Sequence, residues 1–113
     1  MSASPQASVA TQAAACAPSG TIVKVTALNK AFDSGCLAAP AGSAFSLTMV
    51  NQDPGIPHNV AIYTDASAST NLFRGEVVSG PTTATYKVPA LKVGTYYFRC
   101  DIHPQMSGTF VVR

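Results

Sequence analysis

One short segment near the C-terminus carries a thiol, an imidazole and a thioether at regular spacing. These belong to Cys100, His103 and Met106, each three residues from the next. A second imidazole, His58, lies 42 residues before Cys100, and the sequence has no other histidine. One tight loop can aim the first three side chains at a single point, whereas His58 must come from another strand. The chain is therefore expected to fold into a rigid scaffold that brings a remote residue against this loop.

The donor types indicate which ion such a loop would bind. Soft thiolate and thioether sulfur atoms suit Cu(I), and imidazole suits both oxidation states of copper. Two imidazoles and a thiolate in a trigonal plane, with a long axial thioether, form the ligand set of a mononuclear electron-transfer copper site. We therefore predict one copper ion, cycling between Cu(II) and Cu(I), bound by His58, Cys100, His103 and Met106.

Each of these residues also has an ordinary structural explanation. A lone buried cysteine usually behaves as a small hydrophobic residue, and methionine commonly fills gaps in a core. A lone histidine is usually exposed or hydrogen-bonded in the core. The four donors together, in this order and spacing, favour a metal site over those explanations. A structural zinc site fits less well, because zinc binds imidazole, thiolate and carboxylate rather than thioether.

The rest of the chain has the pattern of short β-strands. Residues 43–50 alternate, with Phe45, Leu47 and Met49 on one face. Proline and glycine interrupt the apolar segments at intervals typical of an antiparallel β-sandwich. The pattern predicts a turn at 51–55 and at most a turn or two of helix within 65–72. Strands are expected at residues 21–28, 43–50, 58–64, 82–88, 93–100 and 108–112.

The residues around the donors resemble those of the cupredoxins, a family of small blue-copper proteins. Residues 57–59, with the sequence Pro-His-Asn, are similar to the plastocyanin and amicyanin members. The short loop 100–106, with Pro104 after its histidine, looks like that of amicyanin, and strand 94–100 is similar across the family. The resemblance runs from about residue 21 to Arg113. It implies an antiparallel Greek-key β-sandwich with the copper ligands at one end.

The surroundings of the thiol can also be anticipated. Because side chains alternate along a strand, Phe98 and Tyr96 should share the face of Cys100. The resemblance implies that Asn59 braces the ligand loop. Asp101, next to the thiol, should favour Cu(II) slightly if its charge is not screened.

Residues 1–20 differ in composition from the rest of the chain. Ala, Ser, Thr, Gln and Pro dominate them, and none is aromatic. Such a segment buries too little apolar surface to offset the entropy lost on ordering. We expect a flexible linker or tail at 1–20, followed by one domain at 21–113. The tail lacks the basic start and apolar stretch of a signal peptide, so we expect a signal or lipid anchor upstream in the native protein.

Two cysteines remain once Cys100 is assigned to the metal. Cys16 and Cys36 can pair or stay as free thiols. Free thiols beside copper are prone to oxidation, which favours pairing. A bridge closing the 20-residue separation would contribute about 3 kcal/mol in the chain-entropy description. Such a bridge predicts an oxidising, extracytoplasmic location: periplasmic, cell-surface or secreted.

Composition and local sequence exclude several functions. Charged residues are 11% of the chain, the net charge is +2, and the seven Lys and Arg residues are scattered, which argues against nucleic-acid binding. No apolar run reaches the ~18 residues needed for a transmembrane helix. Arg99 and Asp101 flank Cys100, so the histidines that link a second copper in multicopper enzymes are absent. A filled ligand set leaves no open position for a substrate, so we do not expect an enzyme.

Two functions fit these observations. The first is a monomeric electron carrier that docks redox proteins at an apolar patch near His103, formed by Ile56, Pro57, Pro104 and Gln105. The alternative is a copper-binding protein for storage, delivery or resistance. A buried thiolate and an axial thioether favour the carrier, because delivery needs exposed, exchangeable ligands.

Overall fold

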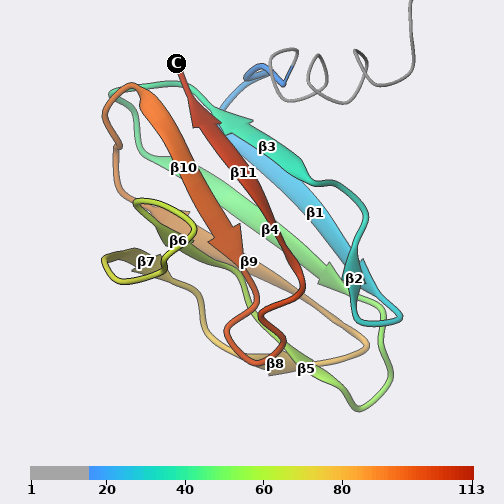
Figure 1. The fold of residues 1–113 in the computed structure, drawn as a ribbon. Helices are drawn as coiled ribbons and strands as arrows, with labels where there is room; N and C mark the ends of the chain where they lie inside the picture. Colours follow the sequence, from blue (N-terminus) through green and yellow to red (C-terminus); the bar gives the residue numbers. More distant parts are fainter. Residues whose placement is uncertain (1–15) are drawn as a thin grey trace, which may run out of the picture.

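The structure is a computed structural model that describes residues 16–113, and this part of the chain is built from β-strands (Figure 1). The strands are β1 (Ile22–Leu28), β2 (Ala31–Phe32), β3 (Cys36–Ala39), β4 (Phe45–Asn51), β5 (Pro57–His58), β6 (Ala61–Tyr63), β7 (Asn71–Arg74), β8 (Val78–Ser79), β9 (Thr82–Val88), β10 (Gly94–Arg99) and β11 (Ser107–Val112). One sheet has the order β2-β1-β4-β9, and the other has the order β3-β11-β10-β6-β7. Strands β5 and β8 form a separate pair.

The core lies between the two sheets. Phe45, Leu47 and Met49 of β4 are buried, as the alternating pattern predicts. Phe98 of β10 and Phe110 of β11 face them from the other sheet, with ring centroids 6.4 Å apart. Burying a side chain of this size contributes about 1.5–3 kcal/mol. This shared core fixes the two sheets against each other, and with them the loops at each end.

The predicted all-β sandwich is confirmed, and its strand pairing is mixed. Strand β1 pairs with β4 in parallel, and β3 pairs with β11 in parallel. The other ladders, including β4 with β9 and β10 with β11, are antiparallel. The β1–β4 pair is parallel because the chain leaves the first sheet after β2, forms β3 in the second sheet, and returns to β4 beside β1.

The long strands lie where the sequence predicts them, and the short ones do not. Strands β1, β4, β9, β10 and β11 match the expected ranges within two residues at either end. The expected strand at 58–64 is split into β5 and β6, because Asn59 leaves the ladder to bind other loops. The expected helical turns at 65–72 are wrong: the Asp65 side chain accepts from Ser67, which makes a tight turn, and β7 begins at Asn71.

The two ends of the sandwich carry different features. Cys16 and Cys36 form the expected disulfide, which ties the segment before β1 to the start of β3. In Figure 1 this segment and the C-terminus lie at one end, while β5, β8 and the loop after β10 lie at the other. Residues 1–15 lie outside the described residues, so the linker expected at 1–20 stays a prediction. Residues 16–113 contain no helix long and apolar enough to cross a membrane.

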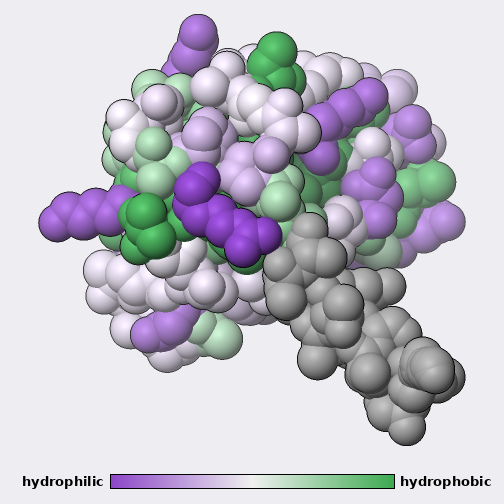
Figure 2. Space-filling view, turned by 90° about the horizontal axis from the view of Figure 1, so that it is seen from above, coloured by the Kyte–Doolittle hydropathy of each residue, from purple (hydrophilic) through white to green (hydrophobic). Residues whose placement is uncertain are grey.

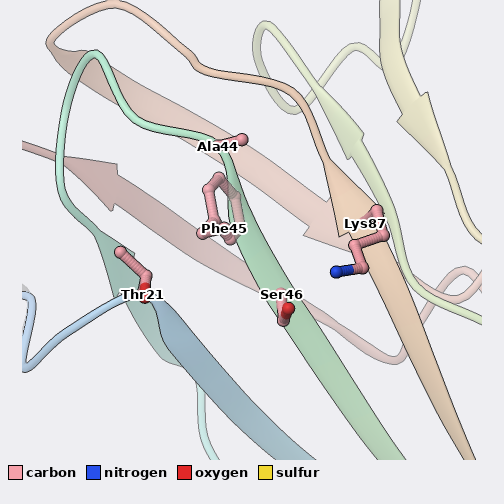
Figure 3. A pocket seen from close by; sticks show the side chains of 5 residues that line it. All are labelled: Thr21, Ala44, Phe45, Ser46 and Lys87. Atoms are coloured by element: carbon pink, nitrogen blue, oxygen red, sulfur yellow. The ribbon is translucent and has the colours of Figure 1, made fainter.

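A shallow pocket of about 130 Å³ opens beside the starts of β1 and β4 and the end of β9 (Figure 3). It is lined by Thr21, Ala44, Phe45, Ser46 and Lys87. Strand β4 runs from this pocket toward the end that carries β5. The pocket is therefore remote from the predicted ligands, and it is smaller than the usual 300–1,000 Å³ of small-molecule sites.

Candidate metal centre

Three of the four predicted ligands converge at the end of the sandwich marked by β5. His58 belongs to β5, Cys100 directly follows β10, and His103 lies in the loop between β10 and β11. The Cys100 Sγ atom is 3.7 Å from Nδ1 of His58 and 3.8 Å from Nδ1 of His103. All three donor atoms lie within 4.8 Å of one another. Both histidines thus turn the same ring nitrogen toward the thiol.

The ligand loop is closed by its own backbone. The Cys100 N–H donates to the Met106 carbonyl at 2.9 Å, and the Met106 N–H donates to the His103 carbonyl at 2.8 Å. The Met106 side chain is buried and packs with Cys100 and Ala27 in a small apolar cluster. The fourth predicted ligand therefore belongs to the same buried cluster as Cys100, and its role as an axial ligand stays a prediction.

Access to the centre is limited to one side. Cys100 and His58 are 0% exposed, whereas His103 is half-buried. Burial, and secondarily the proximity of His58, lowers the pKa of His103. A lowered pKa keeps the imidazole neutral, which is the form that binds metal ions. The edge of His103 is therefore the group that links the buried donors to the surface.

Sequence reasoning missed Asp53, which holds the far side of the His58 ring. Its Oδ2 atom lies 2.7 Å from Nε2 of His58. The same carboxylate accepts from the N–H groups of Asn29 at 2.5 Å and Lys30 at 2.9 Å. The hydrogen bond with His58, followed by the one from Lys30, holds the pKa of Asp53 below its usual value. The one sequence signal for this role is that a carboxylate lies five residues before His58. It lies within the predicted turn at 51–55, where an aspartate is common without any such role.

Asn51 organises the loop that carries Asp53. Its Nδ2 group donates to the carbonyls of Ile56 and Val78, each at 2.9 Å, and its Oδ1 accepts from the Asp53 N–H at 3.0 Å. The side chain is 1% exposed. Because a buried amide that loses its partners is costly, this network fixes the path of residues 51–57. Asn51 thereby sets where both Asp53 and His58 lie.

The expected brace by Asn59 is confirmed. Its Oδ1 accepts from the Asp101 N–H at 2.8 Å, and its Nδ2 donates to the Gly75 carbonyl at 3.0 Å. Asn59 is fully buried. It therefore links the segment that carries His58 to the first residue of the ligand loop after Cys100.

The charge of Asp101 is screened by two arginines. Nε of Arg99 and Nε of Arg74 each lie 3.1 Å from a carboxylate oxygen of Asp101, and the Tyr63 hydroxyl donates to it at 2.5 Å. Burial alone would raise the pKa of Asp101, but the hydrogen bonds from Tyr63 and Arg99 outweigh it and lower that pKa. Asp101 was expected to favour Cu(II) only if its charge were unscreened. Because both arginines pair with it, that condition is not met.

A catalytic triad with a cysteine nucleophile would use the same residue types as Asp53, His58 and Cys100. Such a thiol must reach a substrate, and Cys100 is 0% exposed. A triad also needs only one histidine beside the thiol. The second imidazole, that of His103, is explained by a metal site. A buried sulfur with two convergent imidazole nitrogens suits copper or zinc, and the adjacent thioether of Met106 favours copper.

Comparisons with known proteins agree with this fold. The family model described as a cupredoxin-like domain matches residues 2–112. No curated protein matches the sequence. Among solved structures, the dithionite-reduced auracyanin of the photosynthetic bacterium Roseiflexus castenholzii has a TM-score of 0.73 at 19% identity, covering 82% of this chain and 97% of that chain.

Two further solved structures extend the comparison. Auracyanin A of Chloroflexus aurantiacus, described as a "blue" copper protein, has a TM-score of 0.71 at 19% identity and covers 83% of this chain and 99% of its own. A reduced mutant of amicyanin has a TM-score of 0.61 at 22% identity and covers 82% of this chain and 83% of its own. At such identities the structural likeness establishes the fold alone. Together with the family match, it leads to one conclusion: the chain belongs to the cupredoxin-like family.

Proposed function

We propose that this protein binds one copper ion through His58, Cys100, His103 and Met106 and carries single electrons between redox partners. The convergence of one buried sulfur and two imidazole Nδ1 atoms within 4.8 Å carries this proposal. When bound, copper would supply the one-electron couple between Cu(II) and Cu(I). The description of auracyanin A, a structural neighbour, as a "blue" copper protein supports it.

The scaffold supports the ligands through contacts that do not involve the ion. The ligand loop is closed by two backbone hydrogen bonds, and Asn59 and Asp53 support it from neighbouring segments. Ligands that are held in this way rearrange little when an electron arrives or leaves. The buried positions of Cys100 and His58 also exclude water from the sulfur. Both properties suit fast electron transfer rather than catalysis, so we propose a carrier and not an enzyme.

Electrons would pass through the exposed edge of His103. Ile102 is 42% exposed, Pro104 and Gln105 are exposed, and Ile56 is half-buried. Figure 2 views the molecule from the opposite end, where strongly hydrophilic side chains are interspersed with single apolar ones. A small apolar surface around His103 suits weak, transient docking of a redox protein to a monomeric carrier.

Copper storage or delivery is the alternative. Delivery requires that a partner reach the ligands, and two of the three convergent donors are fully buried. The disulfide between Cys16 and Cys36 supports an oxidising, extracytoplasmic location for either function. The burial of the donors therefore favours the carrier.

Electron self-exchange separates the two functions. We expect mixtures of oxidised and reduced protein to show fast exchange by NMR line broadening, and copper to leave only slowly for a chelator. Ile102→Glu should slow self-exchange, because it places a charge beside His103. Val93→Glu is the matched control. Val93 is 73% exposed and directly precedes the first residue of β10, whereas Cys100 follows its last residue. Slow exchange with rapid copper loss to the chelator would instead favour delivery.

A further inference from the structure

We propose that Asp53 is a positioning residue that fixes the tautomer of His58 and, by its negative charge, favours Cu(II) over Cu(I) at the centre. This inference rests on the proposed function and deepens it. It concerns a residue five positions before His58, in a segment that the sequence predicts to be a turn.

The first observation is that the His58 ring lies between Asp53 and the thiol. Nε2 lies 2.7 Å from Oδ2 of Asp53, and Nδ1 lies 3.7 Å from Sγ of Cys100. An ionised carboxylate can only accept a hydrogen bond, so Nε2 must carry the proton. Nδ1 then keeps its lone pair for the metal. A carboxylate that bonds the outer nitrogen of a ligand histidine in this way orients the ring and raises its basicity.

The second observation is that Asp53 is itself held rigidly. Asn29 and Lys30 connect β1 to β2 and have φ angles of 56° and 58°, in the left-handed region that residues other than glycine rarely adopt. Their two consecutive N–H groups both donate to the Asp53 carboxylate. Positive φ angles at both residues are what the two-residue turn of this hairpin requires, and this turn directs two neighbouring N–H groups to one side. The carboxylate is thus aimed at His58 by a turn from a different part of the sheet.

The third observation concerns charge. The Asp101 carboxylate beside Cys100 is paired with Arg74 and Arg99. By contrast, no lysine or arginine side chain within residues 16–113 pairs with Asp53, whose side chain is 7% exposed and hydrogen-bonds to the neutral His58 ring. Its charge is therefore poorly screened by solvent and acts on the centre through the His58 ring. A negative charge there stabilises the more positive ion, Cu(II), and lowers the reduction potential.

The tautomer can be measured without copper. Long-range ¹H–¹⁵N NMR correlation of the metal-free protein distinguishes the protonated from the bare ring nitrogen. We expect His58 to be protonated at Nε2 with Nδ1 bare. A proton on Nδ1 in the wild-type protein would overturn the proposal. This measurement needs neither metal nor a variant, so it tests the tautomer even if the protein does not bind copper. A failure to bind copper would contradict the proposed function and not the tautomer of His58.

The charge effect is tested with Asp53→Asn in the copper-loaded protein. Loss of a partner of this kind typically lowers metal affinity by 10- to 100-fold. We expect the affinity for Cu(II) to fall about tenfold more than that for Cu(I), which raises the potential by about 59 mV for one electron. The blue colour should persist, because the thiolate is unchanged.

Asp33→Asn is the matched control. It removes the same charge from the residue that follows β2, but Asp33 is exposed and its carboxylate accepts from the Thr26 N–H rather than from His58. We expect its potential to stay at the wild-type value. Equal shifts in the two variants would mean that net charge alone sets the potential, and the proposal would be wrong.

Discussion

Met106 is the residue that completes the apolar side of the centre, where it is buried against Cys100 and Ala27. Met106→Leu removes the thioether at nearly constant volume, a change that cores usually tolerate. We predict that the blue colour persists, since it depends on the thiolate, and that the potential rises, because the axial donor that tunes it is lost. Voltammetry of the two proteins checks this. An unchanged potential would show that Met106 is packing and not a ligand.

Asn59 offers a second prediction at this scale. Asn59→Ala leaves the Asp101 N–H and the Gly75 carbonyl without their partner in a buried place. Each unsatisfied group of this kind costs about 1–3 kcal/mol. We therefore predict a clear loss in the free energy of unfolding of the metal-free protein, measured with urea.

The control for this variant is Asn71→Ala. Asn71 also donates through Nδ2 to two carbonyls, but it is exposed, so water can replace it. We expect a change within about 0.5 kcal/mol there. An equal loss in the free energy of unfolding for both variants would contradict a stabilising role of the buried Asn59 hydrogen bonds.

The sequence predicted the donors better than it predicted their supports. Residue type and spacing alone point to Cys100, His103 and Met106, because a loop this short must bring them together. Asp53 and Asn51 carry no such signal, since their partners are chosen by the turn at 29–30 and by the folded path of 51–57. Hydrogen-bond partners from distant segments can be read only once the register of the strands is known.

At the scale of elements, the loops that carry the site are packed so closely that one glycine is required. Gly80 lies between β8 and β9, and a Cβ atom added there would collide with the Asp53 carbonyl and lie 2.8 Å from Oδ1 of Asn51. We predict that Gly80→Ala displaces the loop that carries Asp53 and His58. Stability should fall by about 1–3 kcal/mol, as in overpacked sites, and copper affinity should fall with it.

Gly35→Ala provides the comparison for Gly80→Ala. An added Cβ at Gly35 meets nothing within 4 Å, and its backbone does not require a glycine. Denaturant unfolding and copper titration of the two variants should differ, with Gly35→Ala near the wild type. Wild-type behaviour of Gly80→Ala would contradict the close approach of these loops.

The elements themselves were predictable in proportion to their length. Strands β4 and β9 have seven residues each, enough for an alternating pattern to identify a buried face. Strands β2, β5 and β8 have two residues each and carry no period at all. The alternating pattern of a strand also does not indicate which strand it pairs with. The parallel pairing of β4 with β1 could therefore not be predicted from it. Pairing of this kind is decided by how the whole sandwich closes.

At the scale of the whole molecule, stability should depend on pH at both extremes. The folded pKa values of Asp53 and Asp101 lie below the usual 3.8. A lowered carboxyl pKa contributes stability that is present above that value and is lost as pH falls through the folded pKa. We predict that the metal-free protein loses stability below about pH 4, as measured by denaturant unfolding across a pH series. Constant stability down to about pH 2 would contradict these shifts.

The alkaline limit should reflect Tyr86. Burial, aided by the nearby Cys100 and Glu76, raises the pKa of Tyr86 from 10.0 to about 12, and its hydroxyl donates to the Glu76 carbonyl. A raised pKa contributes stability that is present below pH 10 and is lost as pH rises toward about 12. Tyr86→Phe should remove this part of the alkaline loss. An identical alkaline slope in the variant would contradict this assignment.

The described chain ends and the candidate metal centre lie at opposite ends of the molecule. In Figure 1 the segment before β1 and the C-terminus lie at one end of the sandwich, while β5, β8 and the loop after β10, which carry the predicted ligands, lie at the other. The proposed carrier would therefore dock its partners at a face that points away from the segment before β1. Both the proposed carrier function and the role proposed for Asp53 require that Cys100 binds copper as a thiolate.

The most direct measurement is the visible spectrum of the purified protein after addition of one equivalent of Cu(II), repeated with Cys100→Ser. We predict an intense blue thiolate-to-copper band in the wild type and none in Cys100→Ser. A colourless wild type, or the same weak colour in both proteins, would show that the four residues do not bind copper together, and the proposed electron carrier would have to be abandoned.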